Sequence, residues 1–370
     1  MPKIESIVTD RVLVPLRDEW IIACGRYTHK SSPFPIVRVR AAGIEGFGEV
    51  SGTYEWSGEG FETAEAAIKN VLAPVLIGTD LNPNSICVTM ERALAGFNFT
   101  KAAIEMACWD AIGKGFNAPI NTLLGGRVRD SVYSKFSVSG VPPDEAVAIV
   151  RAAWEKGFRK FKVKVGLGLT EDLARVEAVR KFLGDEISLA VDANGGWTLG
   201  EARRALRPLE ELNICAIEQP LPAGNLRELA ALRAHSNIPI LLDESVWSHS
   251  DIAIAVQLGA ADAVNIYVGK SGGIMGAFQA VKLAHTLGIG ATMGSNLELG
   301  IGHAAILQVL SVSDGFDLDT YPPDVAGPMY YDANVVEPGF KINDGMVTVP
   351  TGPGLGVTIN EEALSRFKVA

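Results

Sequence analysis

The sequence is poor in cysteine and lacks any cysteine pattern that binds metal or builds a disulfide framework. Only four cysteines occur in 370 residues, and no two of them form a C-x-x-C pair. This spacing excludes a zinc ribbon and a small disulfide-stapled domain. We therefore expect buried thiols at all four positions, which are Cys24, Cys87, Cys108 and Cys215.

Positive charge is also in the minority. The chain has 33 Lys and Arg residues against 43 Asp and Glu residues, a net charge of −10. A protein that coats nucleic acid carries the opposite balance, so nucleic acid is excluded as a main partner. No apolar run reaches the roughly 18 residues of a membrane span, so no membrane contact is expected. The first residues show no secretory signal, and a cytoplasmic location is expected.

The N-terminal third shows the sequence pattern of a small domain that contains both strands and helices. Residues 3–52 show the period-two alternation of strands and predict a three-stranded meander. Helical patterns follow at 62–76, 84–95 and 100–114. We expect an α+β domain over residues 1–128. Two polar and aromatic loops, at 19–33 and 51–60, are candidate lids.

Beyond about residue 129, short β-rich runs alternate with helical segments. This alternation is typical of repeated βα units around a parallel sheet. A closed barrel over residues 129–325 is favoured over an open sheet. Residues 326–370 are punctuated by Pro and Gly and are expected to return to the first domain. The eight expected strand cores are 132–138, 160–165, 188–191, 215–217, 240–242, 263–268, 290–293 and 315–318.

Ionisable residues close these strands at intervals of about one βα unit. Barrel strands carry their chemistry at their C-terminal ends, so these side chains should meet at one rim. Asp192, Glu218 and Asp243 lie on neighbouring strands, and three crowded carboxylates repel one another unless a cation lies between them. Oxygen donors without Cys or His favour Mg²⁺ over Zn²⁺. Glu244 or Asn194 could instead ligate or support the ligands.

Three lysines accompany the carboxylates. Lys162 and Lys164 are two residues apart on one strand and point to the same face, while Lys270 approaches from the other side of the metal. A lysine is a poor base at neutral pH, but a nearby Mg²⁺ and a second ammonium both disfavour its charged form. One of these lysines is therefore a candidate acid or base.

These residues together resemble the site of a known family, the enolase superfamily, and specifically its muconate lactonizing enzyme subgroup. Further matching segments are ACWDAIGK at 107–114, DANGGW at 192–197 and GPGLG at 352–356. The residues that carry the resemblance are Lys162, Lys164, Asp192, Glu218, Asp243 and Lys270.

The resemblance implies an α/β fold: a modified TIM barrel, (β/α)7β, with an α+β N-terminal capping domain completed by the C-terminal tail. It also implies one catalytic Mg²⁺, for which Mn²⁺ could substitute, and an enolate formed from a small carboxylate. Lys162 would bind the substrate carboxylate together with the metal. Lys164 and Lys270 would face the α-carbon from opposite sides, and Glu298 would stabilise the enolate oxygen. A homo-oligomer, dimer or octamer, is expected by the same resemblance.

The leading hypothesis is a Mg²⁺-dependent isomerase of the muconate cycloisomerase type. The same residues also support dehydration to o-succinylbenzoate and epimerisation of dipeptides or N-acyl amino acids. A second alternative, from another class, is a metal-binding scaffold that has kept the fold without turnover.

Several residues are candidates for holding the substrate. Asp317 and Asp319 resemble the paired aspartates with which dipeptide epimerases hold a substrate ammonium. Arg26 and His29, in the first loop, suit an anionic distal group. An ordinary strand end or a solvated loop is the plainer interpretation of each. Further candidates are Tyr54 in the second loop and Asn296.

Overall fold

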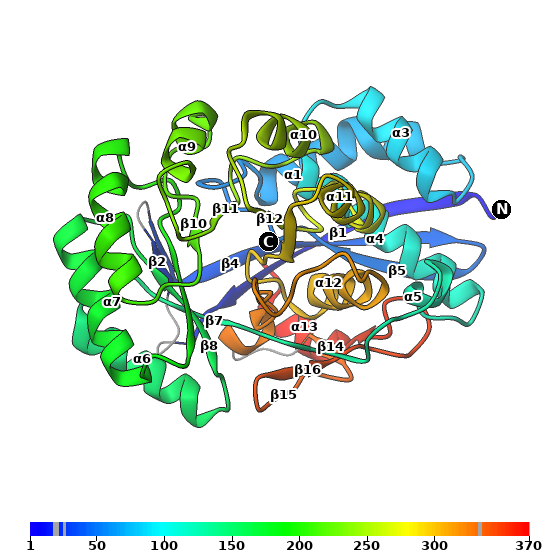
Figure 1. The fold of residues 1–370 in the computed structure, drawn as a ribbon. Coiled ribbons are helices and arrows are strands. Elements are labelled where there is room, and N and C mark those ends of the chain that lie inside the picture. The colour runs from blue at the N-terminus through cyan, green and yellow to red at the C-terminus, as the bar shows by residue number, and fades with distance from the viewer. Residues whose placement is uncertain (18–21, 25–26, 332–334, 370) are drawn as a thin grey trace.

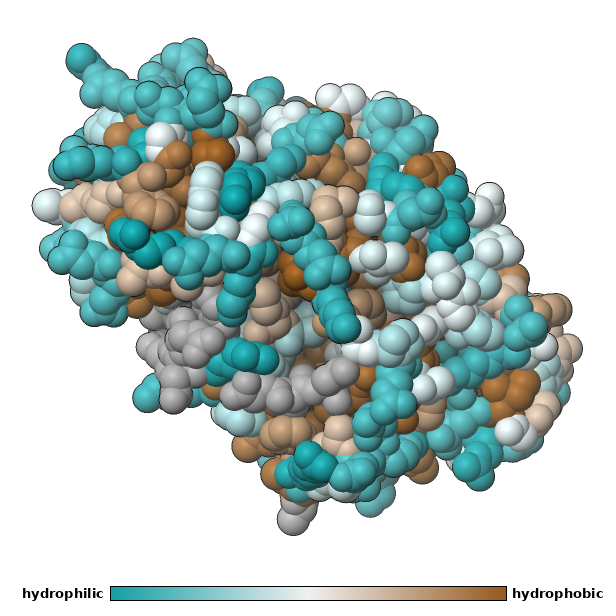
Figure 2. Space-filling view, turned by 90° about the horizontal axis from the view of Figure 1, so that it is seen from below, coloured by the Kyte–Doolittle hydropathy of each residue, from teal (hydrophilic) through white to brown (hydrophobic). Residues whose placement is uncertain are grey.

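A computed structural model of the chain describes residues 1–17, 22–24, 27–331 and 335–369, and only the backbone of 22–24 and 27–29. Figure 1 shows an antiparallel sheet with its own helices beside a parallel sheet that is wrapped by helices. Among the described residues, no helix is both long and apolar enough to cross a membrane. The face in Figure 2 is largely hydrophilic, with apolar residues scattered across it.

The N-terminal sheet has three antiparallel strands in the order β1-β4-β5, which confirms the expected meander. They are β1 (Ile4–Pro15), β4 (Ser31–Ala41) and β5 (Ile44–Glu49). Within the first candidate lid, β2 (Ile22–Cys24) pairs with β3 (Tyr27–His29). The second, residues 51–60, is described throughout and contains no helix or strand.

Glycines let strand β5 lie directly on helix α4 (Asn98–Gly115). A Cβ atom added to Gly48 would stand 1.8 Å from the carbonyl oxygen of Ala103, and one on Gly46 would stand 2.0 Å from that of Ala107. Only glycine permits so close an approach of two backbones. The other helices of this part are α1 (Phe61–Ala67), η2 (Ile68–Leu72), α2 (Ala73–Leu76), α3 (Pro83–Ala93) and α5 (Ile120–Leu123).

The parallel sheet has seven strands among the described residues, in the order β13-β12-β11-β10-β9-β8-β7. They are β7 (Phe136–Val138), β8 (Lys160–Lys164), β9 (Ser188–Asp192), β10 (Ile217–Glu218), β11 (Ile240–Leu242), β12 (Ala263–Ile266) and β13 (Gly290–Met293). The helices that follow them are α6 (Pro143–Glu155), α7 (Leu169–Leu183), α8 (Leu199–Glu211), α9 (Leu226–Arg233), α10 (His249–Leu258), α11 (Ile274–Thr286) and α12 (Gly300–Val312). The expected α/β class, a modified TIM barrel with an α+β N-terminal domain, is confirmed.

The expected eighth strand at 315–318 is wrong, because those residues form no strand. An irregular segment takes its place between β13 and β7. The amide of Asp324 donates to Met293 O at 2.9 Å on one side, and the amide of Lys135 donates to Pro323 O at 2.9 Å on the other. Two consecutive prolines in this segment lack amide hydrogens, which prevents a regular ladder.

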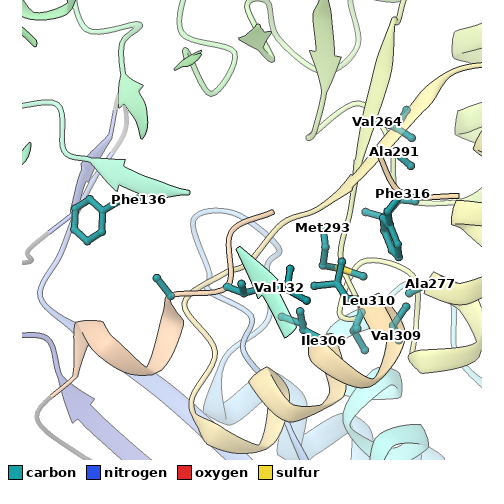
Figure 3. Packing of buried hydrophobic residues seen from close by; sticks show 14 of the residues in the cluster. Val132, Phe136, Val264, Ala277, Ala291, Met293, Ile306, Val309, Leu310 and Phe316 are labelled. Carbon is teal, nitrogen blue, oxygen red and sulfur yellow. The ribbon is translucent and has the colours of Figure 1, made fainter. Parts of the chain in front are cut away.

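The first expected barrel strand, 132–138, is two strands in the structure. Its first half, β6 (Ser131–Tyr133), pairs with β16 (Met346–Thr348) of the C-terminal segment, and only the second half joins the parallel sheet. Behind the sheet, Figure 3 shows Met293 of β13 pointing into a group of apolar side chains that includes Ile306 and Leu310 of α12. This core holds the last strands and their helices together.

The C-terminal segment contacts the N-terminal sheet. Tyr331 forms an isolated bridge with Leu16, and Lys368 forms one with Val12. Arg38 of β4 pairs with Glu361 at 2.8 Å. The domain boundaries at 128 and 325 stay predictions. The elements of this segment are η3 (Gly327–Tyr330), β14 (Val336–Glu337), β15 (Ile342–Asn343), β16, β17 (Thr358–Ile359) and α13 (Glu361–Phe367).

Candidate active site

The parallel register brings the ionisable strand ends side by side. Lys164, the last residue of β8, lies opposite Asp192, the last residue of β9. Glu218, which ends β10, also pairs with Asp192. Asp243 directly follows β11, whose Leu241 pairs with Glu218. The predicted carboxylates therefore share one rim, at the carboxyl ends of the strands.

Lys162 joins two of these carboxylates. Its Nζ lies 3.0 Å from Asp192 Oδ2 and 3.1 Å from Glu218 Oε2, and all three side chains are buried. Burial lowers the pKa of Lys162, but Asp192 and Glu218 outweigh it and raise that pKa well above its ordinary value. Burial raises the pKa of Asp192, yet Lys162 and Lys164 outweigh it and hold that pKa well below its usual range. Burial and then Asp192 raise the pKa of Glu218.

Lys164 is tied to the rim by two acceptors. Its Nζ donates to Asp192 Oδ2 at 2.7 Å and to Asn194 Oδ1 at 2.8 Å. The amide of Asn194 in turn donates to Glu244 Oε1 at 2.9 Å. Burial, then Asp243 and Asp192, raise the pKa of Glu244 to about 8. Glu244 Oε2 is buried without a hydrogen-bond partner in the part of the chain that the structure describes.

Lys270 is more deeply placed than Lys164. Its side chain is 1% exposed, against 13% for Lys164. Its Nζ donates to Asp243 Oδ1 at 2.5 Å, to the carbonyl of Asp243 at 2.9 Å and to the carbonyl of Asn265 at 2.8 Å. Three acceptors match the three hydrogens of an ammonium group.

Sequence reasoning missed two neighbours of the carboxylates and the ring that stacks on one of them. Asn265 Nδ2 donates to Glu218 Oε1 at 2.9 Å, and Tyr267 OH donates to Asp243 Oδ2 at 2.7 Å. The ring of Trp56, from the second loop, stacks on Tyr267 with 5.4 Å between centroids. The alternation of strand β12 was the available signal for the first two, because residues 265 and 267 share one face.

Glu298 lies where the two parts of the chain meet. Ser51 of the second loop donates to Glu298 Oε1 at 3.3 Å, and Ser295 donates to Oε2 at 2.5 Å. Asn296 contributes its amide to the same carboxylate at 3.2 Å and its side chain to Ser51 O at 2.5 Å. Burial raises the pKa of Glu298. The second loop and the loop after β13 are thus one hydrogen-bonded unit.

The donor set fits a divalent cation in its chemistry. Among the described residues, no three His, Cys, Asp or Glu side chains are already gathered tightly enough to hold a metal ion. Instead the Lys162 ammonium lies between Asp192 and Glu218 and supplies the positive charge that these carboxylates need. Carboxylate oxygens at three adjacent strand ends are the ligands of a hard ion such as Mg²⁺, which would displace part of these lysine contacts.

The remaining candidates are not brought to the rim. Tyr54 is 47% exposed, and its hydroxyl contacts Glu62 on α1. The carboxylate of Asp319 is fully exposed, and its Oδ1 lies 3.8 Å from Nζ of Lys160 at the start of β8. Strand β8 has five residues, so its two ends lie roughly 13 Å apart.

Asp317 lies at that same far end. Its amide donates to the carbonyl of Ala291, near the start of β13, at 3.0 Å, and its carboxylate accepts from the amide of Thr320. Arg26 lies outside the described residues, and His29 is described only by its backbone in β3.

Comparison with known proteins identifies the family. Residues 7–125 match the N-terminal domain of mandelate racemase / muconate lactonizing enzyme, and residues 145–363 match the enolase C-terminal domain-like model. The N-succinyl-L-Arg/Lys racemase of Bacillus cereus is 33% identical over 99% of this chain and 98% of that protein. The chloromuconate cycloisomerase of Cupriavidus pinatubonensis is 35% identical over 92% and 91%.

A solved structure from the same group of enzymes has the same fold as this chain. The muconate lactonizing enzyme from Pseudomonas fluorescens complexed with muconolactone covers 100% of both chains, with a TM-score of 0.94 and 31% identity. The fold and the relatives define an isomerase of the enolase superfamily. Within it, the chain belongs to the mandelate racemase / muconate lactonizing enzyme family, so the expected membership is confirmed. The relatives differ in substrate.

Proposed function

We propose that this protein is a Mg²⁺-dependent isomerase that forms an enolate from a small carboxylate, of the muconate cycloisomerase type. One observation carries the proposal. Lys164, the most exposed of the three lysines at the site, lies directly against Asp192 in a row of three strand-end carboxylates. A cationic acid next to a bound carboxylate is the arrangement that an enolate requires. The cycloisomerases among the relatives support it.

Each residue of the site has a proposed role. Asp192, Glu218 and Asp243 would hold Mg²⁺, which when bound supplies positive charge against the enolate. Lys162, released from its contact with the carboxylates, would bind the substrate carboxylate. Glu298, whose raised pKa favours its protonated form, would donate a hydrogen bond to the developing oxyanion.

Cycloisomerisation needs one proton delivery. An oxygen of the distal carboxylate adds to the conjugated double bond, so a C–O bond forms and the π electrons move into the enolate of the other carboxylate. The Lys164 ammonium then gives one proton to the α-carbon and is left as a neutral amine. Before the next turnover the neutral Lys164 amine takes a proton from solvent water, so the net reaction converts the dicarboxylate and one proton into the lactone monocarboxylate.

The alternative is epimerisation of a dipeptide or N-acyl amino acid. The racemase among the relatives favours the N-acyl form, because it acts on N-succinyl amino acids by name. The L-Ala-D/L-Glu epimerases among the relatives support the dipeptide form in the same way, but the structure brings neither of its predicted acidic partners to the rim. Its ammonium would need an acidic partner, and Asp317 and Asp319 lie at the far end of the strands. Mn²⁺ is the proposed substitute metal in either case.

The experiment is proton NMR in D₂O with Mg²⁺, using cis,cis-muconate, muconolactone, dipeptides and N-acyl amino acids. Lactone signals with deuterium beside the carboxylate support the cycloisomerase. Exchange confined to amino acid derivatives replaces it with the epimerase. The matched control is Lys164→Ala in the same mixtures.

The non-catalytic scaffold is the second alternative. It predicts no exchange in any substrate and metal binding that is indifferent to Lys164→Ala. The cytoplasmic location and the homo-oligomeric state expected from the sequence stay predictions. Sedimentation velocity measures the latter directly.

A further inference from the structure

A second cavity lies on the outside of the barrel, between helices α12 and α6. The segment that closes the barrel between β13 and β7 is followed, among the described residues, by the short helix η3 and not by a long helix. The C-terminal segment covers this place, because β15 and β16 join β6 in one sheet directly before β7. A cavity of about 470 Å³ remains there, lined by His303 of α12, Lys156 at the end of α6, Met329 of η3 and Ile342 of β15.

The wall of this cavity reverses the charge of the chain. Three of its side chains are cationic, those of Arg17, Lys156 and Lys341, and no Asp or Glu is found among its described lining residues. The chain as a whole has a net charge of −10. A concave wall of one sign raises the local concentration of ions of the opposite sign. The cavity is therefore suited to an anion.

Most of the other side chains in the wall are apolar or aromatic. They are those of Phe340, Tyr331, Met329, Pro328 and Ile342. Such a surface is stabilised by contact with an apolar body, and aromatic rings favour edge-to-face or offset contacts with another ring. An inorganic anion would leave this surface in contact with water. The lining therefore favours an organic anion with an aromatic body.

His303 places a buried imidazole in the same wall. Its side chain is 2% exposed, and its ring meets that of Phe340 edge-on with 4.5 Å between centroids. No described residue forms a hydrogen bond with either ring nitrogen, and burial lowers the pKa of His303 to about 3. The imidazole is therefore neutral, with one donor and one acceptor nitrogen. Buried polar groups normally have a partner, and a ligand in the cavity can supply this one.

The cavity is separate from the row of carboxylates at the strand ends. None of its described lining residues belongs to that site. Tyr331 contacts both places, since its hydroxyl donates to the carbonyl of Leu297 at 2.8 Å and its own carbonyl accepts from Arg17 Nε at 3.1 Å. A ligand of the cavity thus lies on the far side of Tyr331 from the loop that carries Glu298.

We propose that this cavity is a binding site for a small aromatic carboxylate that carries a hydroxyl group opposite its carboxylate. The carboxylate lies at the exposed ammonium groups of Lys156 and Lys341, the ring packs against Phe340, and the hydroxyl pairs with the buried imidazole of His303. The site is additional to the proposed catalytic site and does not depend on the proposed function. In the plainer interpretation His303 only fills space beside Phe340, and the cavity has no preference among ligands.

The first test is isothermal titration calorimetry with three related probes. 4-Hydroxybenzoate has both polar groups, benzoate lacks the hydroxyl, and 4-hydroxybenzyl alcohol lacks the charge. We expect 4-hydroxybenzoate to bind wild type at one site per chain, with a dissociation constant on the order of 0.1 mM. Each of the other probes should bind roughly tenfold more weakly. Equal affinity for all three probes, or no binding of 4-hydroxybenzoate at millimolar concentration, overturns the proposal.

Variants of the wall place the bound probe. His303→Phe keeps a ring beside Phe340 but has no ring nitrogen, and Lys341→Glu reverses a charge at an exposed position where folding is not at risk. Each should weaken binding of 4-hydroxybenzoate roughly tenfold. Lys282→Glu makes the same charge change at an exposed position of α11, outside the cavity, and should bind as wild type. Thermal melting establishes that the variants are folded. Wild-type affinity in both His303→Phe and Lys341→Glu would contradict the assignment.

The last control separates the cavity from the strand-end site, because 4-hydroxybenzoate is itself a carboxylate. Binding at the cavity should be unchanged in Asp192→Asn and in protein treated with EDTA. Binding that is lost in Asp192→Asn and kept in His303→Phe would assign the probe to the strand ends and overturn the proposal. A protein that turns over no substrate but binds the probe as expected would remove the proposed function alone.

Discussion

The carboxylate of Glu49, at the end of β5, accepts a hydrogen bond from the main-chain amide of Leu299 at 2.7 Å, one residue beyond Glu298. Its other oxygen accepts from the amide of Gly302 at 3.0 Å. The N-terminal sheet thus holds the first turn of α12, where free amide hydrogens and the helix dipole favour an acceptor. Through this contact the first part of the chain fixes the position of Glu298.

Glu49 should make stability depend on pH. Burial, and then the nearby Glu298, raise its pKa from 4.5 to about 8. As pH rises from 4.5, the unfolded chain loses this proton while the folded chain keeps it until about pH 8. The contribution of Glu49 to stability therefore falls as pH rises through this window.

The matching experiment compares melting temperatures between pH 5 and pH 8. Glu49→Gln keeps an acceptor for one amide but has no carboxyl to ionise, so its melting temperature should fall less than that of wild type, by on the order of 5 °C. The exposed Glu186→Gln serves as the control and should follow wild type. Parallel curves for all three proteins would show that Glu49 does not titrate in this range.

Asp192 is the residue on which the metal site depends most directly, since Lys162 and Lys164 both contact it. Asp192→Asn should weaken Mn²⁺ binding, measured by electron paramagnetic resonance. It should also lower kcat/KM about a thousandfold, because a metal contributes several kcal/mol of charge stabilisation. Exposed Asp185→Asn is the control. Full activity in Asp192→Asn, or in protein stripped with EDTA, would contradict a metal role.

Trp56 should matter more than Tyr54, although the sequence pointed to Tyr54. The Trp56 ring lies 5.4 Å from Tyr267 and 4.9 Å from Trp247, whereas Tyr54 is exposed and directed at α1. An aromatic contact contributes on the order of 1 kcal/mol, so Trp56→Ala should lower kcat/KM about tenfold. Tyr54→Phe should remain within about twofold of wild type. The reverse order of effects would show that the second loop presents its other aromatic ring.

Much of the fold could be predicted because period-two and βα patterns are local properties of the sequence. The meander, three of the helical segments and the row of strand-end carboxylates all follow from such patterns. The eighth strand expected at 315–318 is wrong, because a later segment takes its place, and Pro322 and Pro323 in that segment lack the amides that a regular ladder needs. There the barrel is closed by main-chain hydrogen bonds, from the amide of Asp324 to Met293 O and from the amide of Lys135 to Pro323 O.

The site was predictable where the chemistry lies at a strand end and less so elsewhere. Spacing by βα units placed Lys270 after the correct strand, β12, but its depth depends on Tyr267 and on Trp56, which is more than 200 residues away in the sequence. The same limit applies to Ser51 at Glu298. Contacts between the loop 51–60 and the barrel are tertiary, and a single sequence carries no periodic signal for them.

Asp319 gives the clearest test of this difference between motif and position. Its motif resembles an ammonium site, but the side chain is fully exposed beside Lys160, at the amino end of the strands. Asp319→Ala should therefore leave kcat/KM for every substrate within about twofold of wild type, as for other exposed substitutions. The same assay applied to Asp192→Asn shows that it detects a loss. If Asp319→Ala abolished turnover of an amino-terminated substrate alone, residues 317–319 would have to reach the other end of the barrel, and the dipeptide epimerase would become the better assignment.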